Sequence, residues 1–371
     1  MVSMKDETIE RLINWFEGKS QPPFRLMISI TSHCNLRCKF CDKWKVRKKE
    51  PLKKIHVLHL IEEAKKLGVR EVHFSGGGEP FFRKKLLLRA MEEVKKHGMR
   101  GLVVTNGTLI KKEDLEKLIH IKWDTINFSL DSYSAEIHDY LRGKGTFKKT
   151  VETICLLNTL KIKYKSLFPT VSISTIINKE NFKDLINFIL FVRRLGCNSI
   201  RFQYVRSITE GASEIGINFD EMRSYVKKAF KLAQEFNMDT NLKDFSFFKN
   251  VESLEDIKRL LLALKGKQFP FSIPCYAPWY IVMVNEEGKI GPCPVWTPRS
   301  NVDIFSFSLK EVWYGKHFSF FREKMIQKNV NGCVCGAPAV SENKCLREEL
   351  KKVWGQYTNN RTHPCLNNFY S

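Results

Sequence analysis

Three cysteines lie within eight residues near the start of the chain, at Cys34, Cys38 and Cys41. They follow an apolar run, residues 24–30, that has the composition of a strand. A cluster of four irons and four sulfides takes four thiolates, so three close cysteines leave one iron open to a small ligand. An open iron suits catalysis better than storage. A zinc site completed by His33 and a set of three buried thiols are the alternatives.

A second candidate strand, residues 71–74, runs into a turn of three glycines followed by Glu79 and Pro80. Glycine has no side chain, so this turn allows the backbone to come close to a ligand. The carboxylate of Glu79 suits an ammonium group, whereas the fork of an arginine suits a carboxylate. Such an arginine, Arg142, lies in residues 138–143, which are expected to form the loop after the candidate strand 125–130. As the alternative, Arg142 is a surface residue before a helix cap.

The cysteine triplet after the first strand and the Gly-Gly-Glu-Pro turn after the second resemble, in this order, the radical S-adenosylmethionine (SAM) superfamily. The resemblance implies that the three cysteines hold a 4Fe–4S cluster and that the methionine amino and carboxylate groups of SAM bind its open iron. It implies that the reduced cluster cleaves SAM to a 5′-deoxyadenosyl radical, which removes a hydrogen from the substrate, as in an oxidoreductase-type enzyme. The positions that match the SAM contacts of the family are Phe40, Gly77, Gly78, Glu79, Asn106, Ser129 and Arg142.

Six candidate strands alternate with helical patterns of about a dozen residues, which is typical of an α/β fold with a parallel sheet. The strands are expected at residues 24–31, 71–75, 102–105, 125–130, 171–177 and 199–204, and the helices include 58–67, 86–97, 147–160, 182–194 and 222–236. Six such units fit a partial (β/α)6 TIM-like barrel, which is the fold that the resemblance implies. The motif residues follow strand carboxyl ends, where barrel enzymes build their sites.

The expected domains are an N-terminal helical extension at residues 1–23, the barrel at 24–236, a linker or cap at 237–274 and a small cysteine-rich α+β domain at 275–371. Six of the eleven cysteines lie in the last hundred residues: Cys275, Cys293, Cys333, Cys335, Cys345 and Cys365. The first two flank a run with the pattern of a hairpin that turns at Gly288, so their thiols are expected near the same end of it.

This region resembles the SPASM or twitch auxiliary iron–sulfur domain of the superfamily. The match is partial, because the last four cysteines follow each other with one, nine and nineteen residues between them. The resemblance implies one or two auxiliary 4Fe–4S clusters held by the six cysteines, and a zinc site is the alternative. The two remaining thiols, Cys155 and Cys197, are expected in the core as small apolar side chains.

Charge and hydropathy limit the partners. The formal net charge is +22, and seven Lys or Arg fall between Lys43 and Lys54. This basic segment is a solvated face, a docking site for a reduced flavodoxin or ferredoxin as electron donor, or an attractor of an anionic substrate; nucleic acid is a less favoured partner. No apolar run approaches the ~18 residues of a membrane span, and residues 1–16 do not form a signal peptide, so a reducing cytoplasm is expected.

An auxiliary cluster that accepts an electron favours oxidative modification, by dehydrogenation or cross-link formation, of a peptide, a protein or a small anionic substrate. A nucleotide cyclase resembling the molybdenum cofactor cyclase is the alternative enzyme, although its terminal glycine pair is absent from residues 368–371. A zinc-stapled RNA-binding protein is the non-enzymatic alternative. It explains the charge and the thiols but not Glu79 on its glycine turn. No motif in residues 206–274 specifies the substrate.

Overall fold

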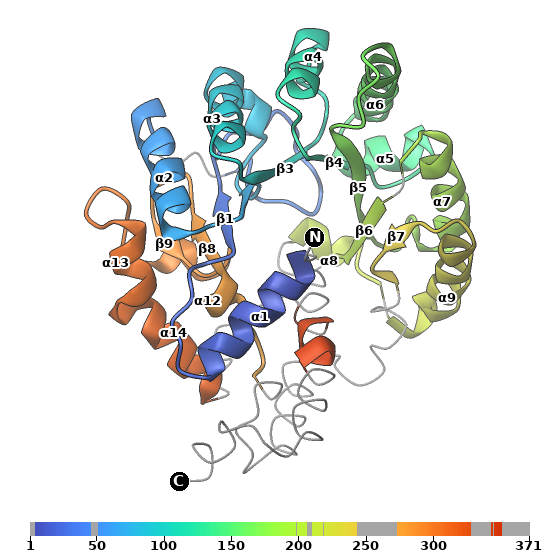
Figure 1. Ribbon diagram of the computed structural model, residues 1–371. Helices are drawn as coiled ribbons and strands as arrows, with labels where there is room; N and C mark the ends of the chain where they lie inside the picture. Colours follow the sequence, from blue (N-terminus) through green and yellow to red (C-terminus); the bar gives the residue numbers. More distant parts are fainter. Residues whose placement is uncertain are drawn as a thin grey trace.

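The centre of the molecule is a curved parallel sheet with helices on its outer face. The structure is a computed structural model, and it describes residues 4–45, 51–197, 199–205, 210–217, 219–242, 273–327, 343 and 345–350. In these residues one nine-stranded sheet has the order β7-β6-β5-β4-β3-β2-β1-β8-β9. Each neighbouring pair is parallel except β8–β9. Figure 1 shows the sheet curving into an open barrel inside a ring of helices.

All six predicted strands are present in the predicted order, and the partial-barrel fold is confirmed. The strands are β1 (Arg25–Ile28), β2 (Glu71–Phe74), β3 (Arg100–Thr105), β4 (Thr125–Ser129), β5 (Thr170–Ile177), β6 (Ser199–Tyr204), β7 (Asp239–Thr240), β8 (Ile281–Val284) and β9 (Ile290–Gly291). The expected hairpin at Gly288 is formed by β8 and β9. Its first strand pairs with β1, so the hairpin extends the barrel sheet itself.

Most of the described helices lie between successive strands and cover the outer face of the sheet, and the others precede the first strand or follow the last. The helices are α1 (Met4–Phe16), α2 (Lys54–Leu67), α3 (Lys84–Lys96), α4 (Lys112–His120), α5 (Ala135–Arg142), α6 (Thr146–Lys163), α7 (Leu185–Arg194), α8 (Glu210–Glu214), α9 (Phe219–Glu235), α12 (Ala277–Tyr280), α13 (Leu309–Tyr314) and α14 (Lys316–Ile326), with short 3-10 turns η1 (Pro80–Arg83), η2 (Phe182–Asp184) and η5 (Thr297–Arg299).

Two expectations are wrong. Residues 138–142 belong to helix α5 and not to a loop, because this segment buries His138 and Leu141 on one face and ends at Gly143. Cys155 is exposed on α6, since the buried face of that helix is set by its neighbours Ile154 and Leu157. The other presumed core thiol, Cys197, is fully buried as expected.

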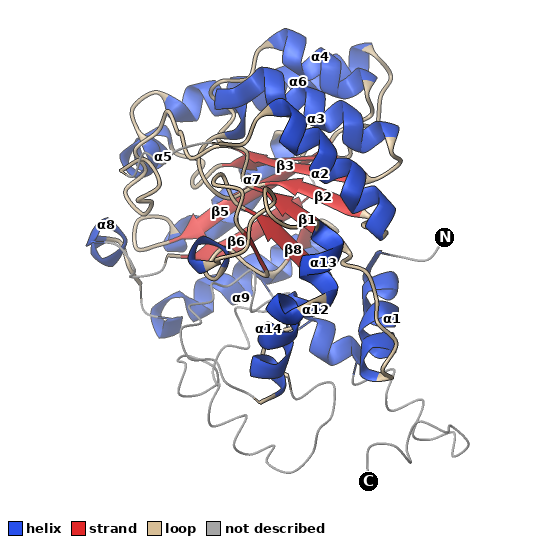
Figure 2. Cartoon of the chain, turned by 90° about the vertical axis from the view of Figure 1, so that its left-hand side faces the viewer, coloured by secondary structure: helices blue, strands red, loops and turns tan. Residues whose placement is uncertain are grey.

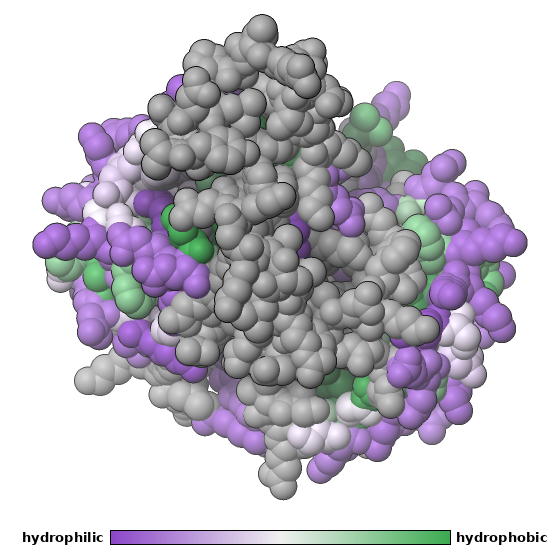
Figure 3. Space-filling model, turned by 90° about the horizontal axis from the view of Figure 1, so that it is seen from below, coloured by the Kyte–Doolittle hydropathy of each residue, from purple (hydrophilic) through white to green (hydrophobic). Residues whose placement is uncertain are grey.

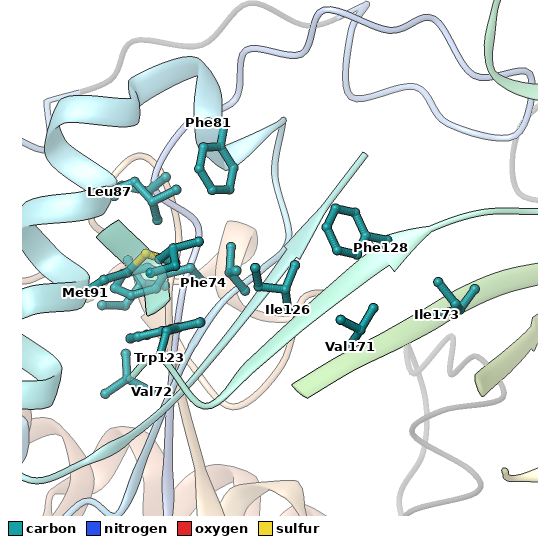
Figure 4. Close-up of a cluster of buried hydrophobic side chains, with 14 of the residues drawn as sticks. Val72, Phe74, Phe81, Leu87, Met91, Trp123, Ile126, Phe128, Val171 and Ile173 are labelled. Carbon is teal, nitrogen blue, oxygen red and sulfur yellow. The ribbon is translucent and has the colours of Figure 1, made fainter. Parts of the chain in front are cut away.

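The main core lies between the sheet and the outer helices. Alternate residues of β4 and β5, including Ile126, Phe128 and Ile173, are fully buried there. Figure 4 shows these side chains on the same side of the strands as Leu87 and Met91 of α3. Because side chains of a strand alternate between its two faces, the intervening residues of the same strands face the barrel interior. That interior face carries the candidate site.

A second core joins the N-terminal helix to the C-terminal region. Trp15 of α1 meets Trp313 of α13 with 6.5 Å between ring centroids, and Arg322 of α14 lies 4.3 Å from the Trp15 ring. Arg322 is buried among these aromatic rings, and burial lowers its pKa to about 10. Figure 2 shows α1 beside α12 and α14, below the sheet. Residues far apart in the sequence therefore form one packed layer.

On the face shown in Figure 3, most of the described side chains around the rim are hydrophilic, and hydrophobic ones form small separate areas. In the described part of the chain, no helix has the length and apolar character needed to cross a membrane.

Gly101 and Trp123 provide a test of the core. A Cβ at Gly101 would lie 2.0 Å from the buried Trp123 ring, so Gly101→Ala should lower the free energy of unfolding by about 1–3 kcal/mol through overpacking. In a Trp123→Ala background, which itself costs about 3–5 kcal/mol, the same glycine change should cost little. Urea unfolding of the four proteins measures this coupling. Equal costs in both backgrounds would show that the two residues do not compete for space.

Candidate functional site

The loop that carries the first three cysteines is held against the glycine turn after β2. Gly78 N donates to Thr31 O at 2.7 Å, and Glu79 N donates to His33 O at 2.8 Å. A Cβ at Gly78 would lie 2.0 Å from His33 O, and one at Gly77 would lie 2.4 Å from Thr31 O. The glycines are therefore required by a close approach to the chain itself, a cause that the sequence pattern did not reveal.

A cavity of about 190 Å³ lies between the cysteine loop and the carboxyl ends of the strands. The three cysteines and all seven residues predicted to contact SAM line it. They reach it from the loop after β1, the turn after β2 and the ends of β3, β4 and α5. Six further residues that line the cavity were not predicted as site residues: Leu36, Lys43, Trp44, Gly76, Val104 and Thr105. Of these, Thr105 directly precedes Asn106, and Trp44 follows Cys41 by three positions.

The thiols of the loop are partly protected from water. Burial raises the pKa of Cys38 to about 11, although Arg142 opposes the shift, and burial also raises the pKa of Cys34. In the described residues, no three metal-binding side chains converge closely enough for a single ion. A four-iron cluster binds each thiolate to a different iron, so its ligands need not converge on one point. Three thiols around one cavity fit such a cluster, which they would hold with one iron left open for a ligand.

Glu79 is buried and already has three protein donors. Its carboxylate accepts from Thr105 Oγ1 at 2.7 Å, Asn106 N at 2.7 Å and Phe81 N at 3.2 Å. Burial raises the pKa of Glu79, and these hydrogen bonds oppose the shift. A carboxylate has about four lone-pair sites, so Oε2, which accepts only the Asn106 bond, retains one for an ammonium group. Glu79 therefore joins the glycine turn to β3 in addition to facing the cavity.

Asn106 connects β3 to the cysteine loop. Its Nδ2 donates to Asn35 Oδ1 at 3.0 Å, and its Oδ1 accepts from Thr108. Asn35 directly follows Cys34. This side chain thus positions the loop, whatever contact it makes with a cofactor.

Arg142 is buried at the end of α5 and forms an ion pair with Asp131, the residue two positions after Ser129. Its Nε donates to Asp131 Oδ2 at 2.5 Å, and its guanidinium lies 5.1 Å from the Phe40 ring. Burial opposes the charge of Arg142, but the adjacent Asp131 raises its pKa overall. Asp131 also accepts from Ile176 N at 2.9 Å. Asp131 was not predicted as a site residue, and its spacing from Ser129 is the only signal in the sequence that could have indicated its role.

The C-terminal cysteines are only partly described. Asn343 Nδ2 donates to Cys275 Sγ at 3.5 Å, and Asn343 lies two positions before Cys345. Cys293 follows β9, and its carbonyl accepts from Thr297. The structure therefore brings the Cys345 segment to Cys275, while the predicted ligands Cys333, Cys335 and Cys365 lie outside the described residues. Which of these cysteines hold an auxiliary cluster therefore stays a prediction.

Comparison with known proteins gives a family match over the barrel. The family described as the Radical SAM superfamily matches residues 28–192. The chain is 24% identical over 315 residues to the tungsten-containing aldehyde ferredoxin oxidoreductase cofactor-modifying protein of Pyrococcus furiosus, with 82% of this chain and 84% of that protein covered. It is 25% identical to the antilisterial bacteriocin subtilosin biosynthesis protein AlbA of Bacillus subtilis, with 88% of this chain and 65% of that protein covered.

Solved structures show the same fold. A crystal structure of Streptococcus suis SuiB bound to S-adenosylmethionine matches with a TM-score of 0.65 at 18% identity, covering 81% of this chain and 68% of that one. A structure of anSMEcpe with bound AdoMet and a peptide matches with a TM-score of 0.61 at 16% identity, covering 92% of this chain and 100% of that one. These comparisons confirm the fold class and the resemblance from which the cofactors were predicted.

His138 should make stability depend on pH. Burial lowers the pKa of His138 to about 4, although Asp131 opposes the shift. The unfolded chain then binds the extra proton between pH 6.5 and pH 4, so stability should fall as the pH is lowered through this range. The expected loss between pH 7 and pH 5 is about 2 kcal/mol.

Urea unfolding at both pH values, for the wild type and His138→Asn, measures this dependence. The asparagine keeps an acceptor for the Asp131 N–H, which donates to His138 Nδ1 at 3.1 Å. The variant should lose less stability on acidification than the wild type. An identical loss in both proteins would place the titrating group elsewhere.

Proposed function

We propose that this enzyme, a member of the radical SAM superfamily with a C-terminal auxiliary domain, oxidatively modifies a peptide or protein side chain. Cys34, Cys38 and Cys41 would hold the 4Fe–4S cluster. When bound, the cluster supplies one electron to cleave SAM into methionine and a 5′-deoxyadenosyl radical, which removes a hydrogen atom from the substrate. The observation that carries the proposal is the single cavity lined by the three cysteines and by the predicted SAM contacts.

The charged residues of the cavity suit the two ends of an amino acid. Asp131 accepts hydrogen bonds from Nε and Nη2 of Arg142 and so orients the guanidinium. The remaining N–H groups of Arg142 can then bind the methionine carboxylate. Glu79 Oε2 can accept a hydrogen bond from the methionine ammonium. Ser129 lines the same cavity beside Arg142 and adds a hydroxyl donor. The Phe40 ring lies 5.1 Å from the Arg142 guanidinium and can offer an apolar surface to adenine.

A net oxidation of the substrate needs an acceptor for a second electron. We assign this role to an auxiliary 4Fe–4S cluster held by Cys275, Cys293 and the later cysteines. The β8–β9 hairpin between these two residues pairs with β1. A rigid sheet thus connects the hairpin to the strand that precedes the first cluster site.

A peptide substrate is supported by the relatives. AlbA is named for subtilosin biosynthesis, and a mycofactocin maturase, MftC of Mycolicibacterium smegmatis, is 28% identical over 208 residues. A probable GTP 3′,8-cyclase of Archaeoglobus fulgidus is 33% identical, but only over 150 residues, or 38% of this chain. Similarity to AlbA extends over 88% of this chain, so peptide modification is the better supported function.

An acidic flavodoxin or ferredoxin is the proposed electron donor. Lys43 lines the cavity, and Lys45 forms an ion pair with the exposed Asp42 at 2.9 Å. The formal net charge of +22 would attract an acidic partner over a long range at low salt. Lys43 thus places a positive charge beside the cavity whose cysteines would hold the cluster that the donor reduces.

Cys38→Ala tests the first cluster. Anaerobically reconstituted wild type should be brown and release 5′-deoxyadenosine when reduced with SAM, whereas Cys38→Ala should lose this activity entirely. Cys155→Ala is the matched control, because Cys155 is exposed on α6 and should have no effect. A Cys38→Ala protein that still cleaves SAM would contradict the assigned ligand set.

Cys293→Ala tests the auxiliary site. This variant should lose about four irons per chain and form no oxidised peptide product, while 5′-deoxyadenosine is still released. Iron analysis and mass spectrometry of the peptide measure the two effects, again with Cys155→Ala as control. Unchanged product formation would remove the auxiliary cluster from the mechanism.

A further inference from the structure

The strands β4 to β7 carry a row of polar side chains on the face that points into the barrel. Asn127, Ser172, Ser199 and Asp239 are register partners across these four strands, and we name them the polar row. Ser172 Oγ donates to Ser199 Oγ at 3.2 Å, and Ser199 Oγ donates to Asp239 Oδ2 at 3.5 Å. The row thus runs from the interior to an exposed carboxylate at the sheet edge.

Asn127, at the inner end of the row, is buried but not satisfied. It is 7% exposed, and its Oδ1 has no hydrogen-bond partner among the described residues. A buried acceptor without a donor destabilises a folded protein, and such groups need an explanation. Val104, its register partner on β3, and Ser129, two residues further along β4, both line the candidate cavity. Asn127 therefore lies about 7 Å deeper than Ser129 on the same face.

The opposite side of the barrel interior carries both apolar and charged groups. Met283 of β8 and Met27 of β1 are register partners there, and Leu102 lies on β3. Arg25 and Glu71, two residues before Met27 and His73 on the same faces, form an ion pair at 2.7 Å, and His73 Nε2 lies 2.9 Å from the same carboxylate. A ligand inside the barrel thus meets hydrogen-bonding groups on one side and, on the other, thioether and aliphatic groups next to charges that already pair with each other.

This arrangement indicates the chemistry of the ligand. The unpartnered Oδ1 requires an N–H or O–H donor. The polar row has no cation of its own, and the adjacent Arg201 is paired with Asp239, so the row offers nothing to neutralise a phosphate group. An extended peptide matches both sides, because it presents backbone N–H groups along its length and apolar side chains away from them.

We propose that Asn127 Oδ1 accepts a hydrogen bond from a backbone N–H of the peptide substrate, below the SAM site. The inference rests on the proposed function and deepens it, because it assigns a substrate-positioning residue in the same barrel. The unsatisfied amide is a stability cost that substrate binding removes.

Melting of the full chain tests the first part. Asn127→Leu replaces the unsatisfied amide by an apolar group of similar size and should raise the melting temperature by about 2 °C. Asn241→Leu is the matched control, because this buried amide accepts from Phe202 N at 2.8 Å and donates to Phe202 O at 2.9 Å. The control should melt at a lower temperature than the wild type. A similar drop for Asn127→Leu would overturn the proposal.

Binding tests the second part, on protein reconstituted with iron and sulfide and saturated with SAM. Titration calorimetry with acetyl-tetraalanine amide should give a Kd that rises about fivefold in Asn127→Leu and stays unchanged in Asn241→Leu. An equal Kd in all three proteins, or no binding to the wild type, would overturn the proposal. Binding of GTP that depends on Asn127 would replace the peptide by a nucleotide. The binding measurement contains no reductant and does not depend on SAM cleavage. A protein that binds the peptide but does not cleave SAM in a separate reduced assay would therefore contradict the proposed function and leave this inference unchanged.

Discussion

The backbone contact between the cysteine loop and the glycine turn is the constraint on which the site depends. Because β1 and β2 are adjacent and parallel, the segments that follow them leave the sheet at the same edge. The carbonyl groups of Thr31 and His33 accept from N–H groups of the turn, and they occupy the space that side chains at Gly77 and Gly78 would need. Any side chain at these glycines would displace the loop and with it all three thiols.

Hydrogen bonds between this contact and the neighbouring strands orient the other side chains of the site. Glu79 leaves the same turn and binds the end of β3, and Asn106 at that end returns to Asn35 in the cysteine loop. Across the cavity, Asp131 fixes Arg142 through two hydrogen bonds. Glu79 and Arg142, the two charged groups predicted to contact SAM, are thus each oriented by other residues of the protein. A site oriented before its ligand binds loses less entropy on binding.

The sequence predicted the six barrel strands, the partial-barrel fold and ten of the sixteen residues that line one cavity, because hydrophobic periodicity and short motifs are local. It did not predict that β8 pairs with β1, since that contact joins residues about 250 positions apart and depends on which sheet edge is open. The partners of Glu79 were missed for the same reason. The helix at residues 138–142 was not predicted, although Ile137 and Leu141 have helical spacing, because a helix of eight residues offers only about two turns of periodic pattern.

Strand β4 shows how one segment serves both stability and function. Ile126 and Phe128 are fully buried beneath the helices, whereas Asn127 and Ser129 face the interior. Because these faces alternate, a shift of one residue in register would exchange core and site side chains completely. The apolar pair therefore fixes where the polar pair points. The stability gained by burying two large side chains also exceeds the cost of one unsatisfied amide, so this strand can keep the unpaired acceptor that we propose binds the substrate.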